Sequence, residues 1–266
     1  MTTTTATQGV GPLLRDWRLR RHRSQMDLAL DAGVSPRHLS FVETGRSKPS
    51  PELLLGLADV LEVPLRERNA FLLAAGYAPH YRQRSLEDPS MARVRAAVDR
   101  LLESHNPYPG VAVDLLWNVV LANDAAQRLM ALLPAELVGP PLNVFRVCLH
   151  PEGLARRTLN FSEWSAYLLS QLHRLQVLTA DPEVSKLADE VARYPTVVGL
   201  RDWRDVARAD EPAILVPWRL RLDSVELSLF TTLTTFGTPQ DITLAELAVE
   251  LFYPADEVSE AALRRA

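Results

Sequence analysis

Short helical segments, separated by glycine and by Ser-Pro pairs, fill the first 76 residues and restrict what this region can fold into. The Ser-Pro pairs at 35–36 and 50–51 each place a capping hydroxyl before a proline whose missing N–H is not needed in the first helical turn. Gly33 separates two segments, and glycine adopts the left-handed turn conformation without steric cost. The pattern predicts five helices within 10–76, with a tight turn between the second and the third.

Two short helices joined by a glycine-containing turn are typical of a helix-turn-helix, whose second helix enters the major groove of DNA. A small helical bundle with no DNA role has the same spacing. Phe41 on the outward face favours DNA binding, because it is costly in water but suits thymine methyl groups. The charge agrees, since residues 1–84 have a net charge of +4 and the remainder has −8. Only the first region is expected to meet a polyanion.

The run from Gln25 to Lys48 resembles the Xre, or lambda-repressor-like, helix-turn-helix class. The resemblance and the outward face of the third helix together imply DNA contacts from Gln25, Ser35, Pro36, Arg37, His38, Ser40, Phe41, Arg46 and Lys48. Pro36 departs from the polar residue that is more usual at its position, because it cannot donate a hydrogen bond to a base. Arg37 is therefore expected to carry most of the base reading, since its guanidinium can pair bidentately with guanine.

The resemblance also implies roles within this set. Gln25 and Ser35 match positions that contact phosphates, Phe41 matches a position that faces base edges, and Glu43 matches a structural glutamate. Arg46 and Lys48, which follow the third helix, are expected to position the protein on DNA by contacting phosphates. We expect double-stranded DNA as a partner and a homodimer, because helix-turn-helix dimers read half-sites about one helical turn apart.

The stretch APHYRQRSLED is polar, basic and without periodicity, which predicts a linker over 78–88. The expected organisation is a disordered tail over 1–9, a helix-turn-helix domain over 10–77, the linker, and a second domain over 89–266.

The second domain is predicted to be an α+β domain with one five-stranded antiparallel sheet. Runs of β-branched and aromatic residues predict strands over 111–114, 117–122, 214–220, 225–235 and 244–253. Helices are expected over 89–104, 123–133, 162–177 with Ser162 as the cap, from 181 onward, and over 255–264. Helices that cover one face of such a sheet leave room for an apolar cavity.

Several separated motifs of this region resemble the ligand-binding domain of MmyB-like regulators, which has a PAS-like fold. They are WNVVLANDAA, NVFRVCLHPEGL and TTLTTFGTPQDITLAELAVELFYPADE, in that order. The resemblance implies a transcriptional regulator with a pocket for a small apolar, fatty-acid-like ligand. As the lining of that pocket we expect the large apolar side chains Trp117, Phe145, Phe161, Trp164 and Phe230.

Two other interpretations of the second domain stay open. It could be a protein-interaction module with a filled core, or an enzyme of unrecognised type. The chain has no G-x-S-x-G, P-loop or G-x-G-x-x-G motif that would favour an enzyme. No cofactor or metal is expected, because the six histidines lack metal-ligand spacing and Cys148 is the sole cysteine. No apolar run is long enough to span a membrane, and we expect a cytoplasmic protein.

Overall fold

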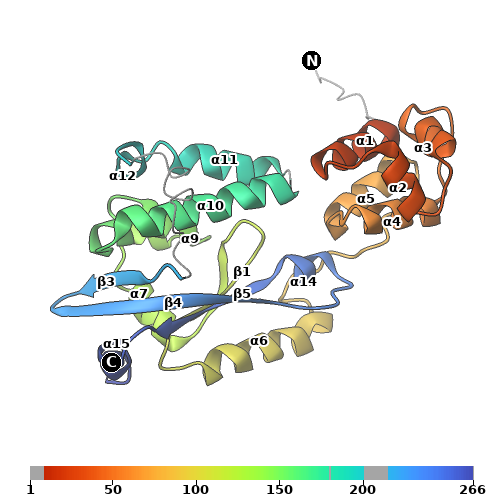
Figure 1. Cartoon of the computed structure of the whole chain (residues 1–266). Coiled ribbons are helices and arrows are strands. Elements are labelled where there is room, and N and C mark those ends of the chain that lie inside the picture. The colour runs from red at the N-terminus through yellow and green to blue at the C-terminus, as the bar shows by residue number, and fades with distance from the viewer. Residues whose placement is uncertain (1–8, 180, 201–214, 266) are drawn as a thin grey trace, which may run out of the picture. The chain divides into compact units, whose positions relative to one another are not determined.

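A computed structural model describes residues 9–179, 181–200 and 215–265, and the chain divides into two compact units (Figure 1). The first unit extends to Arg84 and also includes Thr238–Ala245. The second unit comprises Ser85–Gly237 and the residues from Glu246 onward. The expected tail over 1–9 lies outside the described residues except for Gly9, which precedes the first helix.

Five consecutive helices form most of the first unit, as the sequence predicts. They are α1 (Val10–Arg20), α2 (Gln25–Asp31), α3 (Pro36–Glu43), α4 (Pro51–Val60) and α5 (Leu65–Ala74). Leu14, Trp17, Leu39 and Phe71 are buried in their common core. Gly11 brings the start of α1 close to the end of α3, because a Cβ at this position would collide with a backbone carbonyl.

Side-chain caps fix where α2 and α3 begin. The Ser24 hydroxyl accepts a hydrogen bond from the backbone N–H of Asp27, whose carboxylate accepts in return, which completes a capping box. The Ser35 hydroxyl caps α3 by accepting from the backbone N–H of His38 at 3.1 Å. Gly33 lies between the two helices with φ of +66°, as its place in the turn requires. These local signals set the angle at which α3 leaves α2.

Part of the segment expected to be a linker is hydrogen-bonded to the rest of the first unit. The side chain of Asn69 on α5 accepts from the backbone N–H of Tyr81 at 3.0 Å and donates to its carbonyl at 2.7 Å. The Arg82 carbonyl accepts from the N–H of Ile242 at 2.8 Å, and Arg84 forms an ion pair with Asp241 at 3.0 Å. The chain is therefore anchored as far as Arg84.

The second unit is built on one antiparallel sheet with the strand order β2-β1-β5-β4-β3. Its strands are β1 (Gly110–Val113), β2 (Val119–Ala122), β3 (Trp218–Leu222), β4 (Val225–Thr235) and β5 (Ala248–Pro254). The central strand β5 pairs Val111 of β1 and Leu233 of β4 with Glu250. The prediction of an α+β domain with five antiparallel strands is confirmed.

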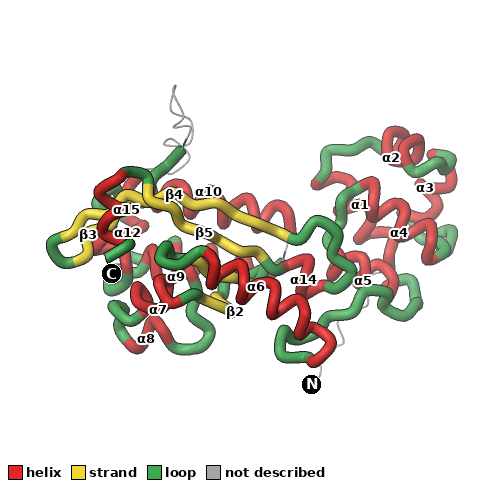
Figure 2. The backbone as a smooth tube through the Cα atoms, turned by 90° about the horizontal axis from the view of Figure 1, so that it is seen from below, coloured by secondary structure: helices red, strands yellow, loops and turns green. Residues whose placement is uncertain are grey.

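Helices cover both faces of this sheet (Figures 1 and 2). On one face, α6 (Ala92–Ser104) packs Val98 and Leu102 against Val249 and Leu251 of β5. On the other lie α7 (Asp124–Met130), α9 (Val144–Leu149), α10 (Phe161–Thr179) and α11 (Pro182–Val191). The remaining helices of the second unit are η1 (Pro89–Met91), α8 (Ala135–Val138), η2 (Leu154–Arg157), α12 (Pro195–Val198) and α15 (Glu257–Leu263). Helix α14 (Ile242–Glu246) belongs to the first unit up to Ala245. Because β5 is central and covered twice, side chains on both of its faces are buried.

Some predicted boundaries are wrong for identifiable reasons. The last strand begins at Ala248 and not at 244, because the Asp241 carboxylate accepts from the backbone N–H of Thr243 at 3.0 Å and starts the helical turn of α14. The second strand begins at Val119, since Trp117 has a φ of +61° and lies in the preceding turn.

Two further boundaries differ on the other side of the domain. Helix α10 begins at Phe161, so Ser162 lies inside its first turn and is not the N-cap. The third strand runs from Trp218 to Leu222, whereas it was expected over 214–220. Residue 214 itself lies outside the described residues, as do 201–213, over which the helix expected from 181 onward has no stated end.

Candidate functional site

The exposed face of α3 presents a phenylalanine between two guanidinium groups. The guanidinium carbon of Arg37 lies 5.4 Å from the centroid of the Phe41 ring, and that of Arg46 lies 6.0 Å from it. Both arginines are exposed, while Phe41 is half-buried. The ring therefore lies within cation–π distance of two cationic side chains on the exposed face of α3.

A buried ion pair holds the underside of α3 against α1. Arg18 donates to both carboxylate oxygens of Glu43, at 2.7 Å and 2.9 Å, and both side chains are almost fully buried. Gln25, the first residue of α2, donates to Glu43 at 2.7 Å. One carboxylate therefore ties together the three helices that set the position of the exposed face.

The pKa of Glu43 reflects these contacts. Burial raises the pKa of the carboxyl group, but the hydrogen bonds from Arg18 and Gln25 and the charge of Arg18 outweigh it, so that the pKa is lowered overall. Glu43 is consequently ionised at neutral pH. Its position agrees with the structural role that the sequence implied.

Two side chains of the first unit keep hydrogen-bond donors that the bonds among the described residues do not use. Gln25 uses one of its two amide hydrogens on Glu43, and the Ser35 hydroxyl accepts its capping bond while its own O–H remains a donor. The ammonium of Lys48 lies 4.7 Å from the centroid of the Tyr77 ring. His38 and Ser40 are half-buried on α3, and Pro36 is exposed at its start.

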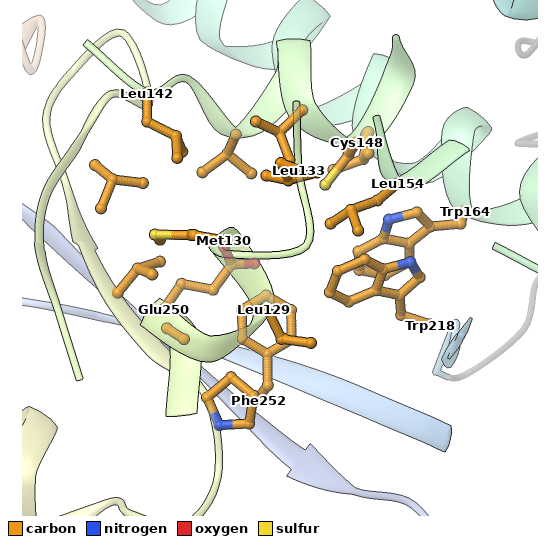
Figure 3. A pocket seen from close by; sticks show the side chains of 17 residues that line it. Leu129, Met130, Leu133, Leu142, Cys148, Leu154, Trp164, Trp218, Glu250 and Phe252 are labelled. Atoms are coloured by element: carbon orange, nitrogen blue, oxygen red, sulfur yellow. The ribbon is translucent and has the colours of Figure 1, made fainter. Parts of the chain in front are cut away.

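A cavity lies in the second unit between the sheet and helices α7, α9 and α10 (Figure 3). Its wall consists mainly of apolar side chains from these elements: Pro109, Val111, Val119, Ala126, Leu129, Met130, Leu133, Leu142, Val144, Val147, Cys148, Leu154, Trp164, Leu168, Trp218, Glu250 and Phe252. The volume of about 70 Å³ exceeds the ~10–15 Å³ that one water molecule requires. It is below the ~150 Å³ of an apolar protein cavity that holds benzene. The cavity as it stands suits a small molecule.

Two aromatic residues form one end of this cavity. The Trp164 ring on α10 stacks on the Trp218 ring on β3, with centroids 5.3 Å apart and an interplanar angle of 9°. The Trp218 N–H donates to the hydroxyl of Thr158 at 3.0 Å, and the buried Trp164 indole lies against the thiol of Cys148. Burial raises the pKa of the neighbouring Cys148 thiol above its usual range, so this cysteine is a neutral part of the wall.

Among the residues of the wall, Glu250 is the one with a carboxyl group. Its side chain projects from the central strand, and the residue is 2% exposed. One carboxyl oxygen, Oε1, accepts from the Thr231 hydroxyl at 2.9 Å, while Oε2 is buried without a partner among the described residues. Burial raises the pKa of Glu250 to about 7, and the Thr231 hydrogen bond acts in the opposite direction.

Comparisons with known proteins agree with this geometry. The family model of the MmyB-like transcription regulator ligand binding domain matches residues 94–266, about two thirds of the chain. The chain belongs to the MmyB-like transcription regulators. A helix-turn-helix family model matches residues 14–68 of this MmyB-like regulator. It is therefore a DNA-binding transcription regulator with a ligand-binding domain, and its families indicate regulation rather than catalysis.

One solved structure and a search of curated proteins complete these comparisons. The crystal structure of the clp gene regulator ClgR from Corynebacterium glutamicum is 29% identical over 38% of the MmyB-like regulator and 94% of that chain, with a TM-score of 0.23. No curated protein matches the chain.

The five residues that were expected to line the pocket lie in different parts of the second unit. Trp164 lines the cavity. Phe145 is fully buried beneath the ring of Trp117, at a centroid distance of 5.1 Å, and neither belongs to the wall. Phe230 stacks on Tyr253 on the face of the sheet that α6 covers, and the half-buried Phe161 begins α10. Of the five, Trp164 belongs to the wall and the other four do not.

The sequence prediction missed the polar wall residue, Glu250. Its neighbours Val249 and Leu251 predict an alternating strand, in which Glu250 would point to solvent. Instead, the second face of β5 is covered by α7, α9 and α10. A carboxylate inside the apolar run LAVELFYP was the available signal.

Two further observations bear on the class of protein. Every helix within 9–179, 181–200 and 215–265 is too short or too polar to cross a membrane. Within the same ranges, no three side chains of His, Cys, Asp or Glu are grouped to hold a metal ion.

Proposed function

We propose that the exposed face of α3 reads operator DNA and that a small, mainly apolar ligand in the cavity of the second unit regulates this binding. The observation that carries the ligand proposal is the cavity itself, whose wall is apolar except for Glu250. A solid core, as a protein-interaction module would have, gives no such space. The ligand shifts the regulator only in so far as it binds two arrangements of the protein with different affinity.

On the DNA side, Arg37 pairs with a guanine, and Phe41 contacts a thymine methyl group. Gln25, Ser35, His38, Ser40, Arg46 and Lys48 contact phosphates or bases around them, and Pro36 packs against the groove. The regulator acts as a homodimer in the cytoplasm, with two α3 helices about one helical turn apart on the operator.

Selection of operator sequences from random DNA with the full chain, followed by a comparison of two variants, tests the DNA proposal. Arg37→Ala should weaken operator binding about 5- to 150-fold, because it removes a base contact, and should weaken binding to random DNA much less. Arg37→Lys is the matched control, since it keeps the charge but loses the bidentate geometry. Equal affinity of wild type and both variants for the operator would contradict the placement of α3.

A fatty-acid-like ligand is compatible with the apolar wall, but a long acyl chain requires more room than about 70 Å³. Leu129, Met130, Leu133 and Leu142 are half-buried, so their movement would enlarge the cavity. Affinity would then rise with chain length, by about 0.8 kcal/mol for each buried CH₂, until the enlarged cavity is full.

Calorimetry with straight-chain ligands of increasing length tests this part. Ala126→Leu fills part of the cavity and should weaken binding of every length, whereas Ala261→Leu on the exposed side of α15 makes the same change elsewhere and should not. Binding that ignores both chain length and Ala126→Leu would show that the cavity is not the ligand site.

A further inference from the structure

Strand β4 has an unpaired edge beyond the end of β3, in the part of the chain that the structure describes. β3 pairs with β4 as far as Leu229, whereas β4 continues along β5 to Thr235 (Figure 1). The last four residues of β4 are exposed, and the side chain at their centre, Leu233, is 53% exposed. A row of backbone N–H and C=O groups along such an edge is a template for another strand.

The hydrogen bonds of Ser228 show which residues present these groups. The Ser228 carbonyl accepts from the N–H of Ala255 at 2.8 Å, so its backbone is turned to the side of β5. Alternate residues of an antiparallel strand bond to the same neighbour. The register of β4 with β5 is continuous up to Thr235. Thr231, Leu233 and Thr235 therefore direct their N–H and C=O groups to the open edge.

The sequence of this edge contains none of the usual protection. Natural sheets block exposed edges with charged side chains, prolines or β-bulges. The segment Phe230–Gly237, FTTLTTFG, has no charged residue and no proline, and its pairing with β5 has no bulge. An uncharged run of residues with high β-propensity aggregates when it stays open. We therefore expect another strand to cover this edge in the native assembly.

The same segment reads identically in both directions. Phe230–Phe236 is FTTLTTF, with Leu233 at its centre. When two copies of one strand pair antiparallel about a two-fold axis, the residue on the axis lies opposite itself. Thr232 then lies opposite Thr234 of the other copy, and a Thr–Thr cross-strand pair is favourable. Every position from 230 to 236 meets its own residue type.

We propose that the regulator dimerises by pairing this edge of β4 with the same edge of a second copy, antiparallel and centred on Leu233. The proposal rests on the proposed homodimer and names its interface. The backbone groups fit, because Leu233 opposite Leu233 and Thr231 opposite Thr235 are then hydrogen-bonded pairs. The lengths fit as well, since the end of one strand at Thr235 stops two residues short of Leu229, where β3 occupies the edge. Such an isologous contact closes after two copies.

Sedimentation equilibrium of the full chain tests the interface through the dimer dissociation constant. Leu233→Lys and Leu233→Glu each place two like charges opposite one another on the axis, so each should weaken the dimer at least tenfold. An equimolar mixture of the two variants should recover the dimer, because Lys then faces Glu, and this recovery also shows that both variants fold. Val120→Lys, at an exposed apolar residue of β2 on the other edge strand, is the matched control and should dimerise as the wild type does.

Disulfide trapping tests the register. Leu233→Cys should form a covalent dimer under mild oxidation, because the Cα atoms of a hydrogen-bonded pair lie about 5.5 Å apart, within the range of a disulfide. Thr235→Cys should not, since its two copies are displaced by four residues, or about 13 Å along the strands. The native Cys148 is buried, so the wild type should stay uncross-linked.

Three results would overturn the proposal. A Leu233→Lys dimer as tight as that of the wild type would show that the two copies meet elsewhere, and the homodimer itself would stand. Trapping of Thr235→Cys as fast as Leu233→Cys would contradict the two-fold register. A wild type that is monomeric both free and on operator DNA would remove the homodimer together with its interface.

Discussion

Removing the charge of Glu43 should cost the DNA-binding unit much of its stability. Glu43→Gln keeps the shape of the side chain but leaves the guanidinium of Arg18, which is 8% exposed, without its anionic partner. Removal of one member of a buried ion pair costs about 3–5 kcal/mol, because the remaining charge stays buried. Domains are typically stable by only about 5–15 kcal/mol. The variant unit is therefore expected to be marginally stable.

Native-state hydrogen exchange in increasing urea, read by mass spectrometry, follows this unit within the full chain. Peptides from residues 10–76 should lose protection at lower urea in Glu43→Gln, while peptides from the second unit keep theirs. Asp31→Asn is the matched control: Asp31 is exposed and its partner Arg23 is half-buried, so the loss should be at most about 1 kcal/mol. Equal losses in the two variants would refute the reasoning.

The same network gives a pH dependence and a rescue. Since the pKa of Glu43 is lowered by folding, its contribution is present above the ordinary carboxyl pKa of 4.5 and is lost as the pH falls through the folded value. The double variant Arg18→Met with Glu43→Leu leaves no buried charge and should recover much of the stability lost in Glu43→Gln.

Three other predictions concern separate features. The folded state holds the Glu250 proton up to about pH 7, whereas the unfolded chain releases it near 4.5. The second unit of the wild type should therefore lose about 3 kcal/mol of stability as the pH rises from 4.5 to 7. Urea unfolding at pH 5 and pH 8 measures this loss, which should be absent in Glu250→Gln. Asp241→Asn should speed tryptic cleavage after Arg84, since it weakens their ion pair, while Asp223→Asn, in an exposed turn, should leave the cleavage rate unchanged. Gly33→Ala should destabilise the first unit by about 1–2 kcal/mol in the exchange assay, because its φ of +66° strains a side chain; unchanged protection would contradict the assigned turn.

The fold was predictable where local signals and periodicity agree. Ser24, Ser35 and Gly33 act through neighbours in sequence, so the helix boundaries around the turn follow from the sequence itself. The strands were predictable for the same reason, because a run of β-branched residues indicates a strand from its own composition. The predicted start of the last strand was wrong because the Asp241 side chain caps α14, and this cap overrides the strand pattern of the residues that follow.

The cavity wall was less predictable, because it depends on which face of each strand is covered and by what. Leu227 and Leu229 alternate with Phe230 along β4, so period two already places Phe230 on the opposite face from them. Glu250 could not be recognised as buried without knowing that β5 is central and that helices cover both faces. Tertiary coverage, and not local sequence, decides such positions.

The first unit includes Thr238–Ala245, so its assembly order differs from its order along the chain. Asp241 follows Arg84 by 157 residues. At a synthesis rate of about 5–20 residues per second, about 10–30 s separate their appearance on a ribosome. During that interval the five helices exist without the segment that binds Arg82 and Arg84. A chain truncated anywhere before Thr238 would stay in that incomplete state permanently, so a shortened DNA-binding fragment and the DNA-binding unit of the whole regulator are different objects.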